Sequence, residues 1–230
     1  MRWGAQIIGA GTDTITIQGV RKLHPCSYEV IPDRIVAGTV MIAAAATRGN
    51  VTLTHTNAGH LTSLIHILRR AGVQITVCND IINISCMGRP RAVERIVTSP
   101  YPSFSYRSAI PGYGSIVPGG RIQCDQGNGF FEGRFKHVEE MARMGADISI
   151  DLNRAFIRGV QRLYGATVEA TDLRAGAALV IAGLAAQGTT IVEQAHHIDR
   201  GYDGIELLFQ KLGARISRKV PVPDPMDMAN

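Results

Sequence analysis

Aromatic residues are scarce in this chain. Phe, Trp and Tyr make up 6% of its 230 residues, and Trp3 is the only tryptophan. Proteins that bind single-stranded nucleic acid stack its bases on aromatic side chains, so this scarcity speaks against such a function. Small apolar residues are frequent instead, within a hydrophobic content of 45%. This composition is typical of a globular domain whose helices and sheets pack closely.

Long apolar runs and closely spaced cysteines are also missing. The longest apolar stretches, residues 40–46 and 179–186, are far shorter than the about 20 residues that a membrane-spanning helix needs. The four cysteines form no Cys-x-x-Cys pair, which favours free thiols in a reducing cytosol over the alternative, disulfides. We therefore expect a soluble, cytoplasmic protein that has no membrane partner.

Basic residues are in excess, but they are not clustered. The formal net charge is +5, and no run of five or six Lys or Arg occurs. A nucleic-acid-binding arm would show such a run, whereas a scattered excess favours small anionic ligands. We therefore expect no nucleic-acid partner. A basic nucleic-acid-binding module remains as an interpretation that rests on the charge alone.

An internal repeat organises the chain. Four segments carry a glycine with an isoleucine three residues later, and they begin at Gly4, Gly72, Gly145 and Gly213, with spacings of 68, 73 and 68 residues. The last three follow amphipathic runs at 64–70, 138–144 and 205–212, which predict helices that end at a glycine cap. Alternating apolar residues at 15–17, 82–84 and 156–157 predict strands.

A second pattern repeats in the same units. Asp33 opens an apolar run that ends at Gly49, and Asp172 opens one that ends at Gly188, so both spacings are 16 residues. These runs predict helices at 35–47 and 175–186, with the aspartates as N-caps. Residues 50–53 and 189–192 predict a strand after each helix.

The repeats predict an α/β domain of three βαβαββ units. We expect residues 1–31 to be the tail of a preceding domain, 32–218 to be the three-repeat domain, and 219–230 to be a loose, proline-rich tail. The middle repeat is damaged, because residues 105–130 are rich in Pro and Gly where the pattern requires an apolar helix. We expect this segment to be irregular and poorly packed.

Three arginines lie near expected helix starts. Arg174 follows the N-cap, Arg200 precedes a helix expected from residue 203, and Arg134 precedes the helix at 138–144. Free N–H groups at a helix start attract anions, and a guanidinium binds phosphate or carboxylate through two donors. The alternative is that the arginines form structural ion pairs with neighbours such as Asp172 and Asp199. The residues alone leave both interpretations open.

Histidine and cysteine give weaker signals. His196 and His197 are adjacent, but no third ligand lies at a useful spacing, so we expect no metal site. Cys78 and Cys86 are expected on neighbouring strands as small core residues.

Several strings carry a specific resemblance. Thr171-Asp172-Leu173-Arg174-Ala175 and His197-Ile198-Asp199-Arg200-Gly201-Tyr202 resemble the carboxy-terminal signature of UDP-N-acetylglucosamine enolpyruvyl transferases. Pro32-Asp33-Arg34-Ile35, followed by Gly38-Thr39, and Phe131-Glu132-Gly133-Arg134-Phe135-Lys136-His137-Val138 are similar to that family as well. The resemblance covers residues 1 to about 218, except 105–130.

The resemblance implies an inside-out α/β barrel domain of three repeats, the enolpyruvyl transferase fold. The implied reaction transfers the enolpyruvyl group of phosphoenolpyruvate to UDP-N-acetylglucosamine, without a cofactor, in peptidoglycan precursor synthesis and hence cell-wall biogenesis. By this resemblance Arg200 and Arg174 hold the phosphoenolpyruvate anion, Arg134 supports them, and Asp172 lies beside the reacting carbons. The remaining substrate-binding positions are Phe130, which contacts the sugar nucleotide, and Asp33.

The chain departs from the family in three places. The general base of a Phe-Pro-Thr-Asp string is replaced by Arg107, and Gly133 stands where the family has Asn. The family's amino-terminal domain is absent from this sequence. We therefore expect this partial chain to be inactive alone. The alternative is a non-catalytic remnant that binds anions or nucleotide sugars.

A shifted reading frame accounts for the damaged segment. Read one base later, codons compatible with Phe104–Pro111 give Phe-Pro-Thr-Asp-Leu-Gln-Ser-Gln, the missing family string with its base at position 107. Position 120 onward similarly gives Glu-Gly-Ser-Ser-Val-Ile-Lys-Glu-Thr-Val. We hypothesise that residues 105–130 come from such a shift. A genuine divergent insertion is the alternative.

Overall fold

The computed structural model describes residues 3–98, 121–126, 137–152 and 154–219. The candidate residues Arg107, Phe130 and Arg134 lie outside these residues, as do Gly133 and residues 220–230 of the expected tail. The chain divides into two compact units, Met1–Pro32 and Asp33–Asn230, which are described separately.

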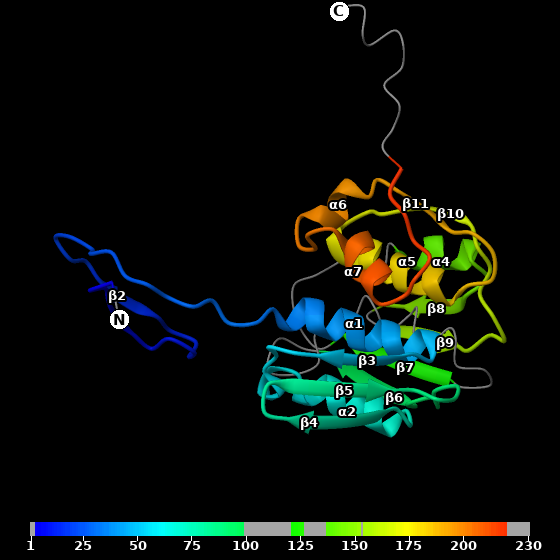
Figure 1. Cartoon of the computed structure of the whole chain (residues 1–230), viewed down its shortest axis with the longest axis horizontal. Coiled ribbons are helices and arrows are strands. Elements are labelled where there is room, and N and C mark those ends of the chain that lie inside the picture. Colours follow the sequence, from blue (N-terminus) through cyan, green and yellow to red (C-terminus); the bar gives the residue numbers. More distant parts are fainter. Residues whose placement is uncertain (1–2, 99–120, 127–136, 153, 220–230) are drawn as a thin grey trace, which may run out of the picture. The chain divides into compact units, whose positions relative to one another are not determined.

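The first unit contains one β-hairpin. Strands β1 (Gln6–Ile8) and β2 (Thr16–Gln18) pair in antiparallel fashion (Figure 1). Gly9 has a φ of +80°, and a Cβ atom there would lie 2.2 Å from the carbonyl oxygen of Thr14, so the turn requires glycine. The hairpin's Ile8 and Ile17 are exposed.

The second unit begins with the first repeat. Its elements are α1 (Arg34–Thr47), β3 (Asn50–Leu53), the 3-10 helix η1 (Ala58–His60), α2 (Thr62–Arg70), β4 (Gln74–Cys78) and β5 (Ile81–Ser85). The three strands form an antiparallel sheet in the order β3-β5-β4. Alternation along β5 buries Ile82 and Ile84 and exposes Asn83, so one face of the sheet is covered.

The middle repeat contributes a four-stranded sheet. Its elements are β6 (Arg95–Thr98), β7 (Arg121–Gln126), α4 (His137–Arg143), β8 (Asp147–Asp151) and β9 (Arg154–Arg158), and the strand order is β6-β7-β9-β8. The expectation that 105–130 are irregular is wrong for β7, which lies inside this sheet. Its Ile122 and Cys124 alternate with polar residues and are buried, which is the pattern of a strand with one covered face. The rest of 105–130 lies outside the described residues.

The third repeat is the last part of the chain that the structure describes. Its elements are β10 (Thr167–Glu169), α5 (Leu173–Ala185), β11 (Ile191–Glu193), the short helix α6 (His196–Asp199) and α7 (Ile205–Lys211). Strands β10 and β11 pair in parallel. Helix α6 was not predicted from the sequence. Within the described residues, no helix combines the length and the hydrophobicity needed to cross a bilayer.

The repeat is visible in the backbone. Gly4, Gly72, Gly145 and Gly213 all have left-handed φ angles, between 83° and 91°. After α2, α4 and α7 the glycine N–H donates to the carbonyl three residues earlier, and the next N–H donates to the carbonyl five residues earlier. This shared geometry confirms the predicted glycine caps.

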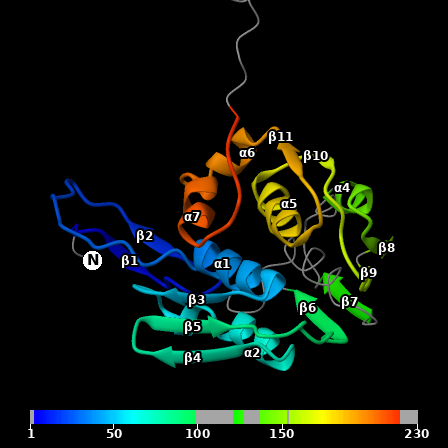
Figure 2. The same cartoon turned by 45° about the vertical axis from the view of Figure 1, so that its right-hand side comes forward.

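The two helices that open at an aspartate form the centre of the second unit. Ten successive residues of α1, 37–46, and eight of α5, 175–182, are buried, and most are Ala or Gly. Figure 2 shows α1 and α5 side by side, and they are in contact. Small side chains permit this close approach, which fixes where the two helix starts lie.

Candidate active site

Asp33 and Asp172 cap the two central helices in the same way. Asp33 Oδ1 accepts hydrogen bonds from the N–H groups of Ile35 (2.7 Å) and Val36 (3.4 Å). Asp172 Oδ1 accepts from the N–H groups two and three residues later, at 2.8 and 3.0 Å. Both aspartates have an extended backbone, so the predicted N-caps are confirmed.

The two described candidate arginines belong to neighbouring elements. As predicted, Arg174 lies in the first turn of α5, and the structure shows that it is exposed. Arg200 precedes α7, as expected, although α7 begins at Ile205 rather than near residue 203; Arg200 is also the C-cap of α6, which was not predicted. Helix α6 comprises only four residues, too few to show a helical sequence period.

Packing brings these arginines to the same end of α5. Gly201, next to Arg200, lies against Leu173, next to Arg174. A Cβ atom at Gly201 would stand 3.0 Å from Leu173 Cδ2. The chain after α6 therefore approaches the start of α5, so the backbone positions of Arg200 and Arg174 lie in the same region.

A buried hydrogen bond ties helix α1 to the same region. Thr39 Oγ1 and Tyr202 Oη are 2.7 Å apart, and both residues are 4% exposed. The pKa of Tyr202 is raised, and burial of its hydroxyl is the largest cause. The negative charge of Asp33 also raises this pKa, whereas the Thr39 hydrogen bond and the positive charge of Arg174 lower it. The charges of Asp33 and Arg174 thus both act on the Tyr202 hydroxyl, which lies against Thr39 of α1. The strings that contain Thr39 and Tyr202 were noticed in the sequence, but this pairing was not.

The aspartates do not pair with the arginines beside them. Asp172 uses its carboxylate as the cap, and Asp199 accepts two hydrogen bonds from Arg218, at 2.8 and 2.6 Å. In the part of the chain that the structure describes, neither Arg174 nor Arg200 forms an ion pair. Within the described residues the structural-bridge interpretation therefore fails for both arginines, and both are exposed.

Comparison with known proteins identifies the family. Residues 1–208 match the family model of EPSP synthase (3-phosphoshikimate 1-carboxyvinyltransferase). The chain belongs to this family. It is 50% identical over 217 residues to UDP-N-acetylglucosamine 1-carboxyvinyltransferase 2 of Caldanaerobacter subterraneus subsp. tengcongensis and 47% identical over 219 residues to UDP-N-acetylglucosamine 1-carboxyvinyltransferase of Trichlorobacter lovleyi. Each match covers 94% of this chain and 51% of the relative, so the chain spans about half the length of these relatives.

Solved structures of EPSP synthase family enzymes share the fold. The enolpyruvyl transferase NikO from Streptomyces tendae superposes with a TM-score of 0.78 at 27% identity, over 93% of this chain and 51% of NikO. EPSP synthase from Acinetobacter baumannii gives a TM-score of 0.66 at 18% identity, over 94% of this chain and 54% of that enzyme, which supports the fold alone. The predicted enolpyruvyl transferase fold and the resemblance to UDP-N-acetylglucosamine enolpyruvyl transferases are confirmed.

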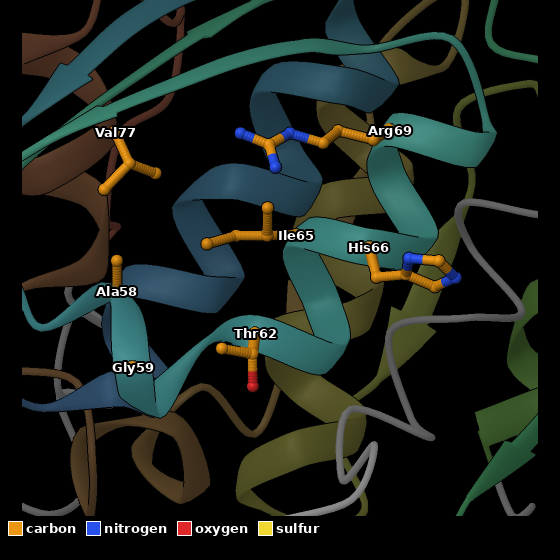
Figure 3. A pocket seen from close by; sticks show the side chains of 7 residues that line it. All are labelled: Ala58, Gly59, Thr62, Ile65, His66, Arg69 and Val77. Atoms are coloured by element: carbon orange, nitrogen blue, oxygen red, sulfur yellow. The ribbon is translucent and has the colours of Figure 1, made fainter.

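Two other features of this EPSP synthase family member lie apart from the candidate residues. Figure 3 shows a surface depression between α2 and β4, lined by Ala58, Gly59, Thr62, Ile65, His66, Arg69 and Val77. Arg69 in this lining donates to the Ile75 carbonyl at 2.7 Å, and none of the candidate residues that the structure describes is among the lining residues. Cys86 is buried, but Cys78 is exposed at the end of β4, so the prediction that both are core residues is wrong for Cys78.

Proposed function

We propose that this chain is the carboxy-terminal half of a UDP-N-acetylglucosamine enolpyruvyl transferase. The whole protein would transfer the enolpyruvyl group of phosphoenolpyruvate to UDP-N-acetylglucosamine in the cytoplasm, in peptidoglycan precursor synthesis. The observation that carries the proposal is the arrangement of Arg174 and Arg200, two exposed arginines without an ion pair in the described residues, at the start of α5. The relatives' names support the choice of substrates.

The geometry suits a doubly anionic substrate. Each guanidinium can bind a carboxylate or phosphate through two parallel N–H donors, and the free N–H groups of the helix start add to this field. In the reaction a sugar hydroxyl bonds to C2 of phosphoenolpyruvate while a proton adds to C3. A proton then leaves C3 and the C2–O bond to phosphate breaks. Cations fixed beside the phosphate stabilise the charge that develops as it departs.

Three further roles belong to the proposal. Arg134 would support the anion site, Phe130 would contact the sugar nucleotide, and Asp172 would lie beside the reacting carbons while it caps α5. At position 107 the sequence has arginine where the reaction requires a base. Because that base is missing and the chain spans about half of its relatives, we expect it to bind substrate anions without turnover when alone. A non-catalytic anion-binding remnant is the second candidate function.

Binding of phosphoenolpyruvate to the full 230-residue chain tests the proposal. We expect Arg174→Gln and Arg200→Gln each to weaken binding about tenfold, because a hydrogen bond to a charged group contributes about 1.5–3 kcal/mol. Arg158→Gln is the matched control, since Arg158 pairs with Asp147 on the exposed face of the β8–β9 sheet. UDP-N-acetylglucosamine should tighten phosphoenolpyruvate binding, and shikimate 3-phosphate should not. Equal affinity of Arg200→Gln and the unaltered chain in calorimetry would refute the proposed anion site.

A further inference from the structure

Arg218 holds two acidic side chains near the end of the described chain. Its Nη1 donates to Asp199 Oδ2 at 2.8 Å, and its Nη2 donates to Asp199 Oδ1 at 2.6 Å. The same Nη2 lies 3.2 Å from Glu206 Oε2. This two-point geometry fixes the orientation of a carboxylate more firmly than a single contact does. The guanidinium therefore clamps α6, through Asp199, to the first turn of α7.

The backbone that carries Arg218 is itself fastened to α7. The Ala214 N–H donates to the Phe209 carbonyl at 2.9 Å, and Gln210 Nε2 donates to the Ile216 carbonyl at 2.6 Å. Ile216 also packs against the main hydrophobic core. The side chain of Arg218 is 34% exposed and that of Glu206 is 16% exposed. This clamp is therefore better anchored than an isolated ion pair on the surface, which contributes little to stability.

One of the carboxylates that Arg218 holds is next to Arg200 in the sequence. Asp199 directly precedes Arg200, so it is the carboxylate nearest to that arginine in sequence. A carboxylate without a partner at this position would compete with any anion for the Arg200 guanidinium. We propose that Arg218 is a positioning residue that holds Asp199 away from Arg200 and so keeps Arg200 available to an anionic substrate. This inference rests on the anion site of the proposed function.

The first test does not depend on ligand binding. The Asp199 carboxyl group is titrated by carbon NMR in the unaltered chain, in Arg218→Gln and in Arg218→Gln/Arg200→Gln. Hydrogen bonds from Arg218 lower the Asp199 pKa in the unaltered chain. If Asp199 turns to Arg200 when Arg218 is lost, its pKa stays low in the single variant and rises only in the double variant, where the charge of His196 is the remaining cause that lowers it. A pKa that rises as far in Arg218→Gln as in the double variant overturns the inference.

The second test measures phosphoenolpyruvate binding by calorimetry. We expect Arg218→Gln to weaken binding about five- to tenfold, the scale of one charge contact near 4 Å in water. The added change Asp199→Asn should restore affinity to within about twofold, and Asp199→Asn alone should not weaken binding, because the competing charge is gone. A clamp with only a structural role predicts weak binding in all three variants, and that result would overturn the inference.

Two controls keep the outcomes separate. Circular dichroism checks that each variant is folded, and Arg158→Gln/Asp147→Asn removes an ion pair outside the candidate site. If the unaltered chain binds no phosphoenolpyruvate, the proposed anion site fails, and the Asp199 titration still decides whether Arg218 keeps Asp199 from Arg200.

Discussion

The side chain of Asp172 caps α5, and under the proposed function it also places a negative charge beside the anion site. Asp172→Ala should lower the free energy of unfolding by about 1 kcal/mol, because two N–H groups lose their acceptor. Asp172→Asn should keep most of that stability, since asparagine caps helices about as well as aspartate. Urea unfolding distinguishes the two variants. The corresponding substitutions Asp33→Ala and Asp33→Asn are the matched control. An Asn variant as unstable as the Ala variant would contradict the capping role.

The buried pair of Thr39 and Tyr202 predicts a loss of stability at alkaline pH. Because the folded-state pKa of Tyr202 is raised, chiefly by burial, its contribution is complete below the ordinary tyrosine pKa of about 10 and is lost as pH rises through the folded pKa. Tyr202→Phe should remove this part of the alkaline decline. At neutral pH it should cost about 1–3 kcal/mol, because buried Thr39 loses its partner.

Urea unfolding between pH 7 and pH 11 measures both effects. Thr39→Val/Tyr202→Phe should be less destabilised than the sum of the single variants, because neither side chain then leaves a buried polar group unpaired. An unchanged alkaline decline in Tyr202→Phe would show that other groups cause it.

Single residues differ in how far the sequence could predict them. The caps at Asp33 and Asp172 depend on neighbours two and three residues away, so local sequence specifies them. The pairing of Asp199 with Arg218 spans 19 residues and depends on how the chain turns after α7. Sequence offered Arg200 as an equally good partner, and only the packed structure distinguishes the two.

At the scale of elements, helix α5 contains two glycines that meet different surroundings. A Cβ atom at Gly176 would lie 2.6 Å from Ile198 Cγ1 of α6, whereas one at Gly183 would lie 3.1 Å from Thr190 Cβ. Alanine is the better helix former by about 1 kcal/mol, which opposes the steric cost at both sites. Gly176→Ala should nevertheless be destabilising, by about 1–3 kcal/mol, because buried Ile198 must move.

Gly183→Ala is the matched control within the same helix and should cost less. Because α6 carries Arg200 at its end, Gly176→Ala should also weaken phosphoenolpyruvate binding, and Gly183→Ala should not. Thermal unfolding and calorimetry measure the two effects. Equal stability of the two variants would show that α6 can move to make room for the added Cβ atom without a loss of folding free energy.

Helices and strands could be predicted from the sequence wherever the pattern of apolar residues was long enough. The Asp-to-Gly spacing located α1 and α5 to within about two residues, the usual uncertainty of helix ends. Helix α6 was not predicted, because a single helical turn is too short to show a repeating pattern of apolar residues. Strand β7 was misread because the prolines and glycines before it dominated the interpretation of 105–130, although Ile122 and Cys124 alternate correctly. Both strands that pair with β7, β6 and β9, are distant in the sequence, so no local pattern predicted the pairing.

At the scale of the whole molecule, the repeat and the family strings led to the fold. Three of the proposed site positions, Arg107, Phe130 and Arg134, lie outside the residues that the structure describes. The printed sequence and the sequence in the shifted frame differ in the middle repeat. As written, β7 is a sound strand, and Asp125 accepts hydrogen bonds from Arg95 and Gln123, each at 2.6 Å. The shifted frame would replace Asp125 by isoleucine and Ile122 by serine. The frame hypothesis covers residues 105–130, of which the structure describes only 121–126.

The nucleotide sequence of the gene decides the frame hypothesis. Aspartate at position 107 in the shifted frame requires that the Arg107 codon be CGA or AGA and that the next codon begin with T. Since only the third base of each codon is free, agreement along some twenty codons would not arise by chance. An Arg107 codon that ends in C, T or G excludes the shift and leaves a divergent insertion.

If the shift holds, the restored chain gains the general base and the apolar helix that the repeat requires. Phosphate release from phosphoenolpyruvate should then appear only when an amino-terminal half from a relative is added, because the chain spans about half of those enzymes. Turnover by the restored chain alone would contradict this expectation.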